Sequence, residues 1–262
     1  MGAWGTAIFS DDTARDVRDE FRDHVGDGLS GPAATDRLLQ AWRDTLADPD
    51  DGPVFWLALA STQWKCGRLE PRVLERALAV IANGAALRRW ADDPKSLAKR
   101  RAALGKLEEQ LRSPAPAEKR IPKRFRNHCE WEVGEVIAYR LRSGRWSLLR
   151  IIAFHSDRGG TSPICELLDW VGDRIPSREE VVSLPVRLTG PDRRPSNQLT
   201  RFMIGRTSER ELPRERVKRL GMKLEPAQQP PVRRGGMQVS WSVIVFSWRF
   251  LDAALERDFG FA

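Results

Sequence analysis

The sequence predicts an α+β protein: an N-terminal all-α helical bundle, then a small antiparallel β domain with a C-terminal helix. Up to about residue 112, apolar residues recur every three or four positions, which is typical of amphipathic helices. Beyond residue 127 they recur every second position, which is typical of strands. A segment rich in proline and basic residues separates the two patterns. We therefore expect a helical domain over 1–112, a basic linker over 113–127 and a β-rich domain over 128–262.

Five helices are expected in the first part of the chain. The first begins after Ser10-Asp11-Asp12, where Ser10 or Asp11 is the expected N-cap, and carries apolar residues on one face. Glycine and proline residues mark the ends of the others. The helix that follows Pro53 is apolar almost all round, so it is expected in the middle of the bundle. The remaining helices are expected at about 33–46, 71–83 and 94–111.

The β-rich part is expected to begin with a hairpin. Alternating apolar residues over 133–141 and 146–154 predict two strands, and Gly144 supplies the positive φ of the turn between them. Further strands are expected at 162–171, 199–206 and 237–246. A short helix is expected at 179–184, and an amphipathic C-terminal helix at 248–259.

Composition and charge favour a folded cytoplasmic protein. No run of eighteen apolar residues predicts a membrane span, and no basic region followed by an apolar run predicts a secretory signal. The net charge is +8, and residues 113–262 hold 27 Lys/Arg against 18 Asp/Glu, so the excess lies in the second half. Arginine makes up 36 of the 44 basic residues, a bias that a GC-rich genome also produces.

The N-terminus carries the most specific pattern. Met-Gly-Ala-Trp-Gly-Thr, followed by Phe9, Asp12 and Asp16, resembles a bacterial family known as domain of unknown function 4259. The resemblance covers about the first 25 residues and implies no chemistry. Trp4, Asp12 and Asp16 are the candidate binding residues, either as a recognition patch or as a carboxylate pair beside an aromatic ring. In the structural alternative, Trp4 anchors the N-terminus and the two carboxylates stabilise the first helix.

The first strands carry a second resemblance. Gly134–Leu141, Gly144-Arg145-Trp146 and Arg150-Ile151-Ile152 are similar to the opening hairpin of an SH3-like barrel in one immunity-protein family of bacterial polymorphic-toxin systems. Glu135 stands where that pattern usually has aspartate. The resemblance implies a protein partner, with a toxin as one class of partner.

Motifs for catalysis, cofactors and metals give no candidate residues. The chain has no G-x-S-x-G, no P-loop and no G-x-G-x-x-G that opens a helix after a strand. Cys66, Cys129 and Cys165 have neither disulfide nor zinc-knuckle spacing, and adjacent His128 and Cys129 would point apart on an extended chain. We therefore expect no catalytic residue, no metal and no cofactor, which favours a non-enzymatic protein over an enzyme.

These observations favour a protein–protein binding module with a role in immunity or defence. The alternative is a nucleic-acid-associated regulator, in which linker cations bind phosphates and two tryptophans stack on bases. The residues of that alternative are Lys119, Arg120, Lys123, Arg124, Arg126, Trp131 and Trp146. The sequence leaves the oligomeric state open.

Overall fold

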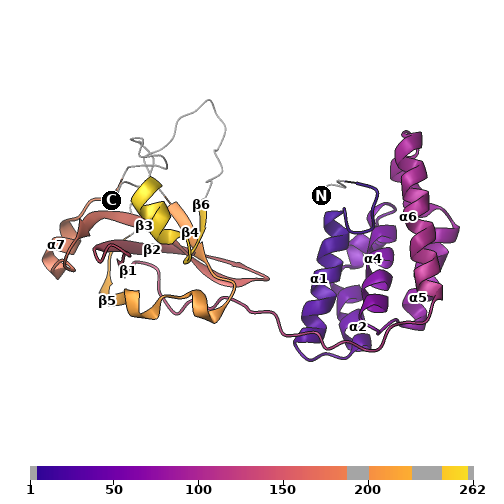
Figure 1. Cartoon of the computed structure of the whole chain (residues 1–262), viewed down its shortest axis with the longest axis horizontal. Helices are drawn as coiled ribbons and strands as arrows, with labels where there is room; N and C mark the ends of the chain where they lie inside the picture. The colour runs from indigo at the N-terminus through magenta and orange to yellow at the C-terminus, as the bar shows by residue number, and fades with distance from the viewer. Residues whose placement is uncertain (1–4, 188–200, 226–243, 259–262) are drawn as a thin grey trace. The chain divides into compact units, whose positions relative to one another are not determined.

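A computed structural model describes residues 5–187, 201–225 and 244–258. The chain forms two compact units, Met1–Arg124 and Phe125–Ala262 (Figure 1). We call them the helical unit and the sheet unit. The predicted α+β class is confirmed, because helices occupy the first unit and a mostly antiparallel six-stranded sheet the second. No helix in the described part of the chain is long and apolar enough to cross a membrane.

The helical unit is a bundle around one central helix. Its elements are α1 (Asp12–Gly26), α2 (Gly31–Ala41), α3 (Arg43–Ala47), α4 (Asp51–Lys65), α5 (Pro71–Ala82), the 3-10 helix η1 (Ala85–Trp90) and α6 (Pro94–Arg112). Helix α4 is buried on most of its surface and packs against α1, α3 and α5, as the uniformly apolar sequence predicts. Asp11 is the N-cap of α1, because its carboxylate accepts a hydrogen bond from the Ala14 amide.

Residues 113–124, which we call the strap, lie against the helical unit. The Lys119 amide donates to the carbonyl of Cys66 at 3.0 Å, and Ile121 packs against the helical core. A Cβ built on Gly26 would lie 2.8 Å from the carbonyl oxygen of Pro122, so glycine permits the close approach of the strap to α1. The sequence predicts an extended, solvated linker over 113–127. In the structure the extended backbone is fixed to the helices up to Arg124.

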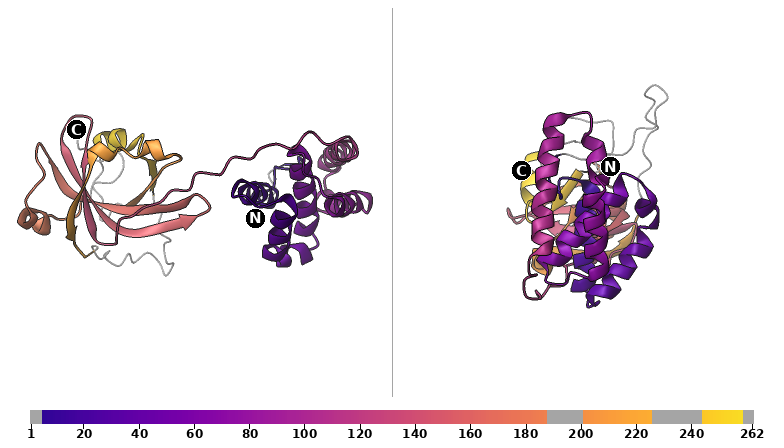
Figure 2. Two further views of the ribbon diagram at one scale, coloured as in Figure 1. Left: turned by 90° about the horizontal axis from the view of Figure 1, so that it is seen from below. Right: turned by 90° about the vertical axis from the view of Figure 1, so that its right-hand side faces the viewer.

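The sheet unit contains six strands in the order β5-β1-β2-β3-β4-β6. They are β1 (Glu135–Arg140), β2 (Trp146–Asp157), β3 (Gly160–Gly172), β4 (Arg201–Gly205), β5 (Val217–Lys223) and β6 (Ile244–Ser247). The sheet is curled rather than flat (Figure 2). Helical segments connect the strands or follow the last one: α7 (Arg178–Ser183), η3 (Glu209–Glu211), η4 (Arg214–Arg216), α8 (Leu251–Ala253) and the π-helical η5 (Ala254–Asp258).

Alternation along the strands separates two apolar layers. Ile137, Tyr139 and Leu149 point to one face, where Leu251 and Leu255 cover them; we call this the α8 face. Val136, Ala138 and Leu148 point to the other face, against Val181 of α7; we call this the α7 face. Both faces are therefore covered by helical segments that come later in the chain.

The predicted hairpin is confirmed, with β1 and β2 antiparallel and Gly144 at φ +90° in the turn. Three features differ from expectation. The helix expected over 248–259 begins at Leu251 and is π-helical from Ala254. Strand β5 is not predicted, and β6 runs parallel to β4 in a sheet expected to be antiparallel. The part of the predicted 237–246 strand before Ile244 lies outside the described residues. The similarity of the first hairpin to the opening hairpin of an SH3-like barrel remains a resemblance in sequence.

Candidate functional site

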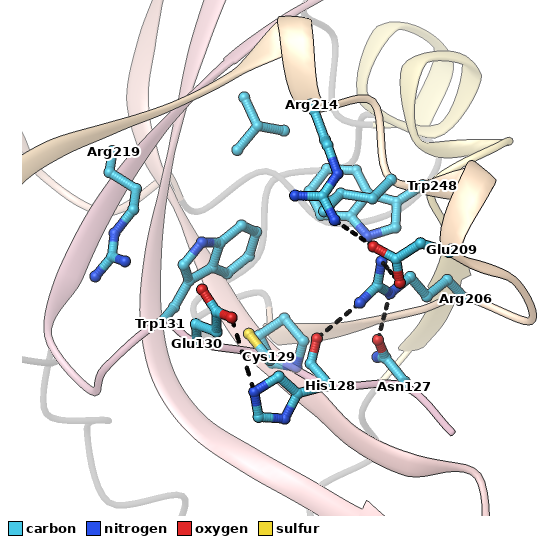
Figure 3. A pocket seen from close by; sticks show the side chains of 13 residues that line it. Asn127, His128, Cys129, Glu130, Trp131, Arg206, Glu209, Arg214, Arg219 and Trp248 are labelled. Carbon is cyan, nitrogen blue, oxygen red and sulfur yellow. Dashed lines mark hydrogen bonds and ion pairs between the residues drawn. The ribbon is translucent and has the colours of Figure 1, made fainter. Parts of the chain in front are cut away.

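A pocket of about 320 Å³ opens on the α8 face of the sheet unit. Its walls come from the segment that precedes β1, from the connection between β4 and β5, and from the chain just after β6 (Figure 3). Strands β3 and β5 also contribute residues. The lining residues are Asn127, His128, Cys129, Glu130, Trp131, Pro163, Arg206, Glu209, Leu212, Arg214, Val217, Arg219 and Trp248.

We call residues 127–131, which precede β1, the first wall of the pocket. Asn127 fixes this wall to the turn between β2 and β3. Its amide donates to the carbonyl of Gly159 at 2.6 Å, and its own carbonyl accepts from the amide of Thr161 at 2.8 Å. Gly160 lies at φ +101°, and a Cβ there would lie 2.1 Å from the carbonyl oxygen of Asn127. Only glycine permits this approach, so the wall depends on a backbone contact that no side chain at position 160 would allow.

Two tryptophans form the apolar floor of the pocket. The rings of Trp131 and Trp248 meet edge to face, with centroids 5.9 Å apart and an interplanar angle of 80°. Trp248 is buried and also contacts the ring of Tyr139 at 5.5 Å, whereas Trp131 is half-buried. Leu212 and Val217 extend this apolar surface. The floor can therefore accept an apolar or aromatic group.

Arg206 brings a buried cation to the pocket. Its side chain is 6% exposed and lies over the ring of Phe125, with 5.4 Å between the guanidinium carbon and the ring centroid. Its Nε donates to Oδ1 of Asn127 at 2.6 Å, and its Nη2 donates to the carbonyl of His128 at 2.8 Å. The first wall therefore holds this guanidinium in place from below (Figure 3).

Glu209 lies between two arginines at the rim. One carboxylate oxygen is 3.1 Å from Nη1 of Arg206, and the other pairs with Arg214. These neighbours lower the pKa of Glu209, with the hydrogen bond from Arg214 as the main cause. Glu209 is 56% exposed and Arg214 is 70% exposed, so both side chains reach the solvent.

Arg219 forms the opposite side of the rim. Its guanidinium binds Glu135, whose side chain is 5% exposed, with Nη2 and Oε2 3.0 Å apart. The exposed imidazole of His128 lies 4.0 Å from the carboxylate of Glu130. The pocket thus combines an apolar floor with a charged rim that contains three arginines.

The thiol beside the pocket is poorly suited to nucleophilic chemistry. Burial raises the pKa of Cys129, which favours the protonated thiol, and the nucleophile in cysteine chemistry is the thiolate. His128 is 76% exposed and pairs with Glu130. Across the described ranges, no group of three or more His, Cys, Asp or Glu side chains is placed to hold a metal ion.

Of the three N-terminal candidates, the structure places Asp12 and Asp16 in the helical unit, outside the pocket lining. Trp4 lies outside the described residues. Asp12 and Asp16 lie in α1, where Asp12 is 3.9 Å from Arg15 and Asp16 is exposed. Asp11, which was not a candidate, caps α1 and pairs with Arg89 at 2.9 Å.

The candidates for nucleic-acid binding are dispersed. Trp131 lies on the α8 face and Trp146 on the α7 face, where Trp146 packs against Arg140. The two rings therefore do not form one stacking platform. Of the basic residues, Lys119, Arg120, Lys123 and Arg124 belong to the helical unit, and Arg126 belongs to the sheet unit.

Most residues of the pocket carry no motif that marks them in the sequence. Arg206 is expected only as the last residue of a strand, and Trp248 only as part of a C-terminal helix. Glu209, Arg214 and Arg219 lie in a segment without strong periodicity. The alternation of arginine and glutamate around Leu212-Pro213 was the one available signal. Only the pairing of β5 with β1 brings this segment next to Trp131.

Comparison of the chain with protein-family models, curated proteins and solved structures found no match.

Proposed function

We propose that this protein is a non-enzymatic binding module that holds an anchoring side chain of a protein partner in the pocket of the sheet unit. The observation that carries the proposal is the pocket itself, with two tryptophans at its floor and arginines at its rim. Interfaces draw most of their binding energy from a few aromatic and arginine side chains around such cavities.

Charge indicates the kind of partner. Residues 113–262 hold 27 Lys/Arg against 18 Asp/Glu, so the sheet unit and strap attract acidic surfaces. A role in immunity or defence rests on the resemblance of the first hairpin to an immunity-protein family. Under that role, a toxin bound by the sheet unit would present an acidic surface.

The alternative is a nucleic-acid-associated regulator. The exposed side chains of Lys119, Arg120 and Lys123 favour it, because they are free to approach phosphates along the strap. The separation of Trp131 from Trp146 on two faces of the sheet weighs against it. We therefore rank it second.

Selection of peptides from a random library displayed on phage tests the first proposal. We expect the full chain to select peptides whose binding is at least ten-fold weaker for Trp131→Leu, because this change removes the ring from the pocket floor. Trp146→Leu is the matched control, since it removes an equally half-buried ring from the opposite face. Circular dichroism of each variant checks that the fold is retained.

Two outcomes would contradict the proposal. One is a selection that yields only peptides insensitive to Trp131→Leu. The other is submicromolar binding of a single-stranded oligonucleotide at 150 mM salt that is lost when the five cations between Lys119 and Arg126 become serine. Such binding would favour the regulator, with a steep salt dependence from the released counterions.

A further inference from the structure

Arg206 is a buried cation with an incompletely satisfied guanidinium. Its Nε and Nη2 have acceptors on the first wall of the pocket. Its Nη1 is buried and, among the described residues, forms no hydrogen bond; its close acidic neighbour is Glu209, at ion-pair distance. A buried donor that lacks a hydrogen bond costs free energy, so this nitrogen favours a better-placed acceptor.

Glu209 is easily displaced from its position between the arginines. Its side chain is 56% exposed, and its second partner, Arg214, is 70% exposed. The ion pair between Glu209 and Arg214 is exposed and weakened by solvent, so it opens readily. The buried guanidinium of Arg206 needs a counter-charge, so Glu209 leaves it when another carboxylate takes its place. Arg206 cannot follow it, because its other nitrogens are held by Asn127 and His128.

We propose that the pocket binds an acidic peptide segment, whose side-chain carboxylate replaces Glu209 on Arg206 and Arg214 while a neighbouring apolar side chain packs on Trp131. Glu209 then acts as an internal competitor for the partner carboxylate. This inference rests on the proposed function and specifies the chemistry of the occupant. A carboxylate held by two guanidinium groups forms charge-assisted hydrogen bonds, which are shorter and stronger than neutral ones.

The position of the floor supports this occupant. Trp131 and Arg206 line the same cavity (Figure 3). Leu212 also belongs to its lining. A cavity of about 320 Å³ accommodates a small number of side chains. A segment with one acidic and one apolar side chain therefore matches both the charge of the rim and the polarity of the floor.

Two blocked synthetic peptides, labelled with fluorescein, test the inference by fluorescence anisotropy. One has the centre glutamate-leucine-phenylalanine-glutamate, and the other has glutamine in place of both glutamates. We expect the full chain to bind the acidic peptide at least ten-fold more tightly. We also expect Glu209→Gln to bind it about three- to ten-fold more tightly than the native protein, because the internal competitor loses its charge.

Matched variants separate this effect from net charge. Glu215→Gln removes the same charge from an exposed residue outside the pocket lining, and it should leave affinity within two-fold of native. Arg214→Gln should weaken the acidic peptide, whereas Arg210→Gln, at an exposed site outside the lining, should not. Repeating the assay with a free C-terminus on the glutamine peptide tests whether a terminal carboxylate binds instead.

The outcomes that overturn the inference are distinct from failure of the proposed function. Equal binding by Glu209→Gln and native protein overturns it, as do equal affinities for the two blocked peptides or binding by the free C-terminus alone. If library peptides still depend on Trp131 but carry no acidic residue, the binding module stands and the acidic occupant is wrong. If no selected peptide depends on Trp131, both are wrong.

Discussion

The hydroxyl of Tyr139 in β1 donates a hydrogen bond to the carboxylate of Asp252 in α8, with 3.1 Å between the oxygens. Both side chains are buried. Asp252 also accepts from the amide of Arg142 and pairs with Arg216, just before β5. Through this one carboxylate, the end of the chain is joined to β1 and to the turn before β5. The same contacts fix Trp248, a few residues before Asp252, at the floor of the pocket.

Asp252→Asn should lower the free energy of unfolding of the sheet unit by about 1.5–3 kcal/mol, because hydrogen bonds to a charged group are lost. Urea denaturation followed by tryptophan fluorescence measures the change. Asp173→Asn, an exposed position in the same unit, should change it by less than about 0.5 kcal/mol. Equal effects from the two substitutions would contradict a structural role for Asp252.

The pKa of Tyr139 predicts a loss of stability at high pH. Burial and the nearby Asp252 carboxylate raise this pKa above the ordinary value of 10.0. The unfolded chain therefore loses the phenolic proton before the folded chain does. The stabilisation linked to this raised pKa is fully present below pH 10. Above pH 10 the free energy of unfolding falls by about 1.4 kcal/mol per pH unit, until the pH reaches the pKa of the folded protein.

Tyr139 is the single tyrosine of the chain, so its ionisation is directly observable. Tyrosinate absorbance should appear only together with unfolding. Tyr139→Phe should show a smaller fall in stability above pH 10 than the native protein. A tyrosinate signal at pH 10 from the folded protein would refute the raised pKa.

Glu166, on the α7 face, is expected to be essential for the stability of the sheet unit. Its fully buried carboxylate pairs with Arg150 at 2.6 Å and with Arg201 at 3.1 Å. Glu166→Gln leaves the buried guanidinium of Arg150 without a counter-charge and should cost about 3–5 kcal/mol. The double change Arg150→Met with Glu166→Leu should recover part of this loss in urea denaturation, since no buried charge remains unpaired. A double variant less stable than the single one would contradict this account.

In the helical unit, Asp11 should matter more than its acidic neighbours. Asp11→Ala removes the N-cap of α1 and the ion pair with Arg89, and should lower the melting temperature, with a cost of about 1–2 kcal/mol. Asp16→Asn, at an exposed site on the same helix, should cost less than about 0.5 kcal/mol. A larger stability cost for Asp16→Asn than for Asp11→Ala would contradict this account and would make Asp16 the more important carboxylate.

The strap should restrict proteolysis between the units. Lys119 is fixed through its amide and Ile121 through the helical core, whereas the boundary between the units follows Arg124. Of the five basic sites in this segment, trypsin should therefore cleave first after Arg124 or Arg126. Mass spectrometry of early fragments identifies the site. Earliest cleavage after Lys119 or Arg120 would show that the strap is not held.

Local sequence determined most helices of the first unit and the first hairpin of the second. The cap at Asp11, the prolines at helix starts and the glycine turn at Gly144 act within a few residues, so the chain alone reveals them. The period of the apolar residues likewise predicted the helical unit and the first hairpin. The buried α4 followed from its apolar surface.

Only the tertiary structure decided which elements meet. Strand β5 has a weak apolar pattern and is stabilised by pairing with β1, and β6 pairs in parallel with β4. The pocket forms only when both of these strand pairings form, because its residues come from segments about 80 to 120 positions apart. Trp131 and Trp146 lie close together along the chain and were both candidates for stacking on bases, yet they lie on opposite faces of the sheet. Periodicity describes neighbours along the chain, whereas a site depends on long-range packing that no local pattern encodes.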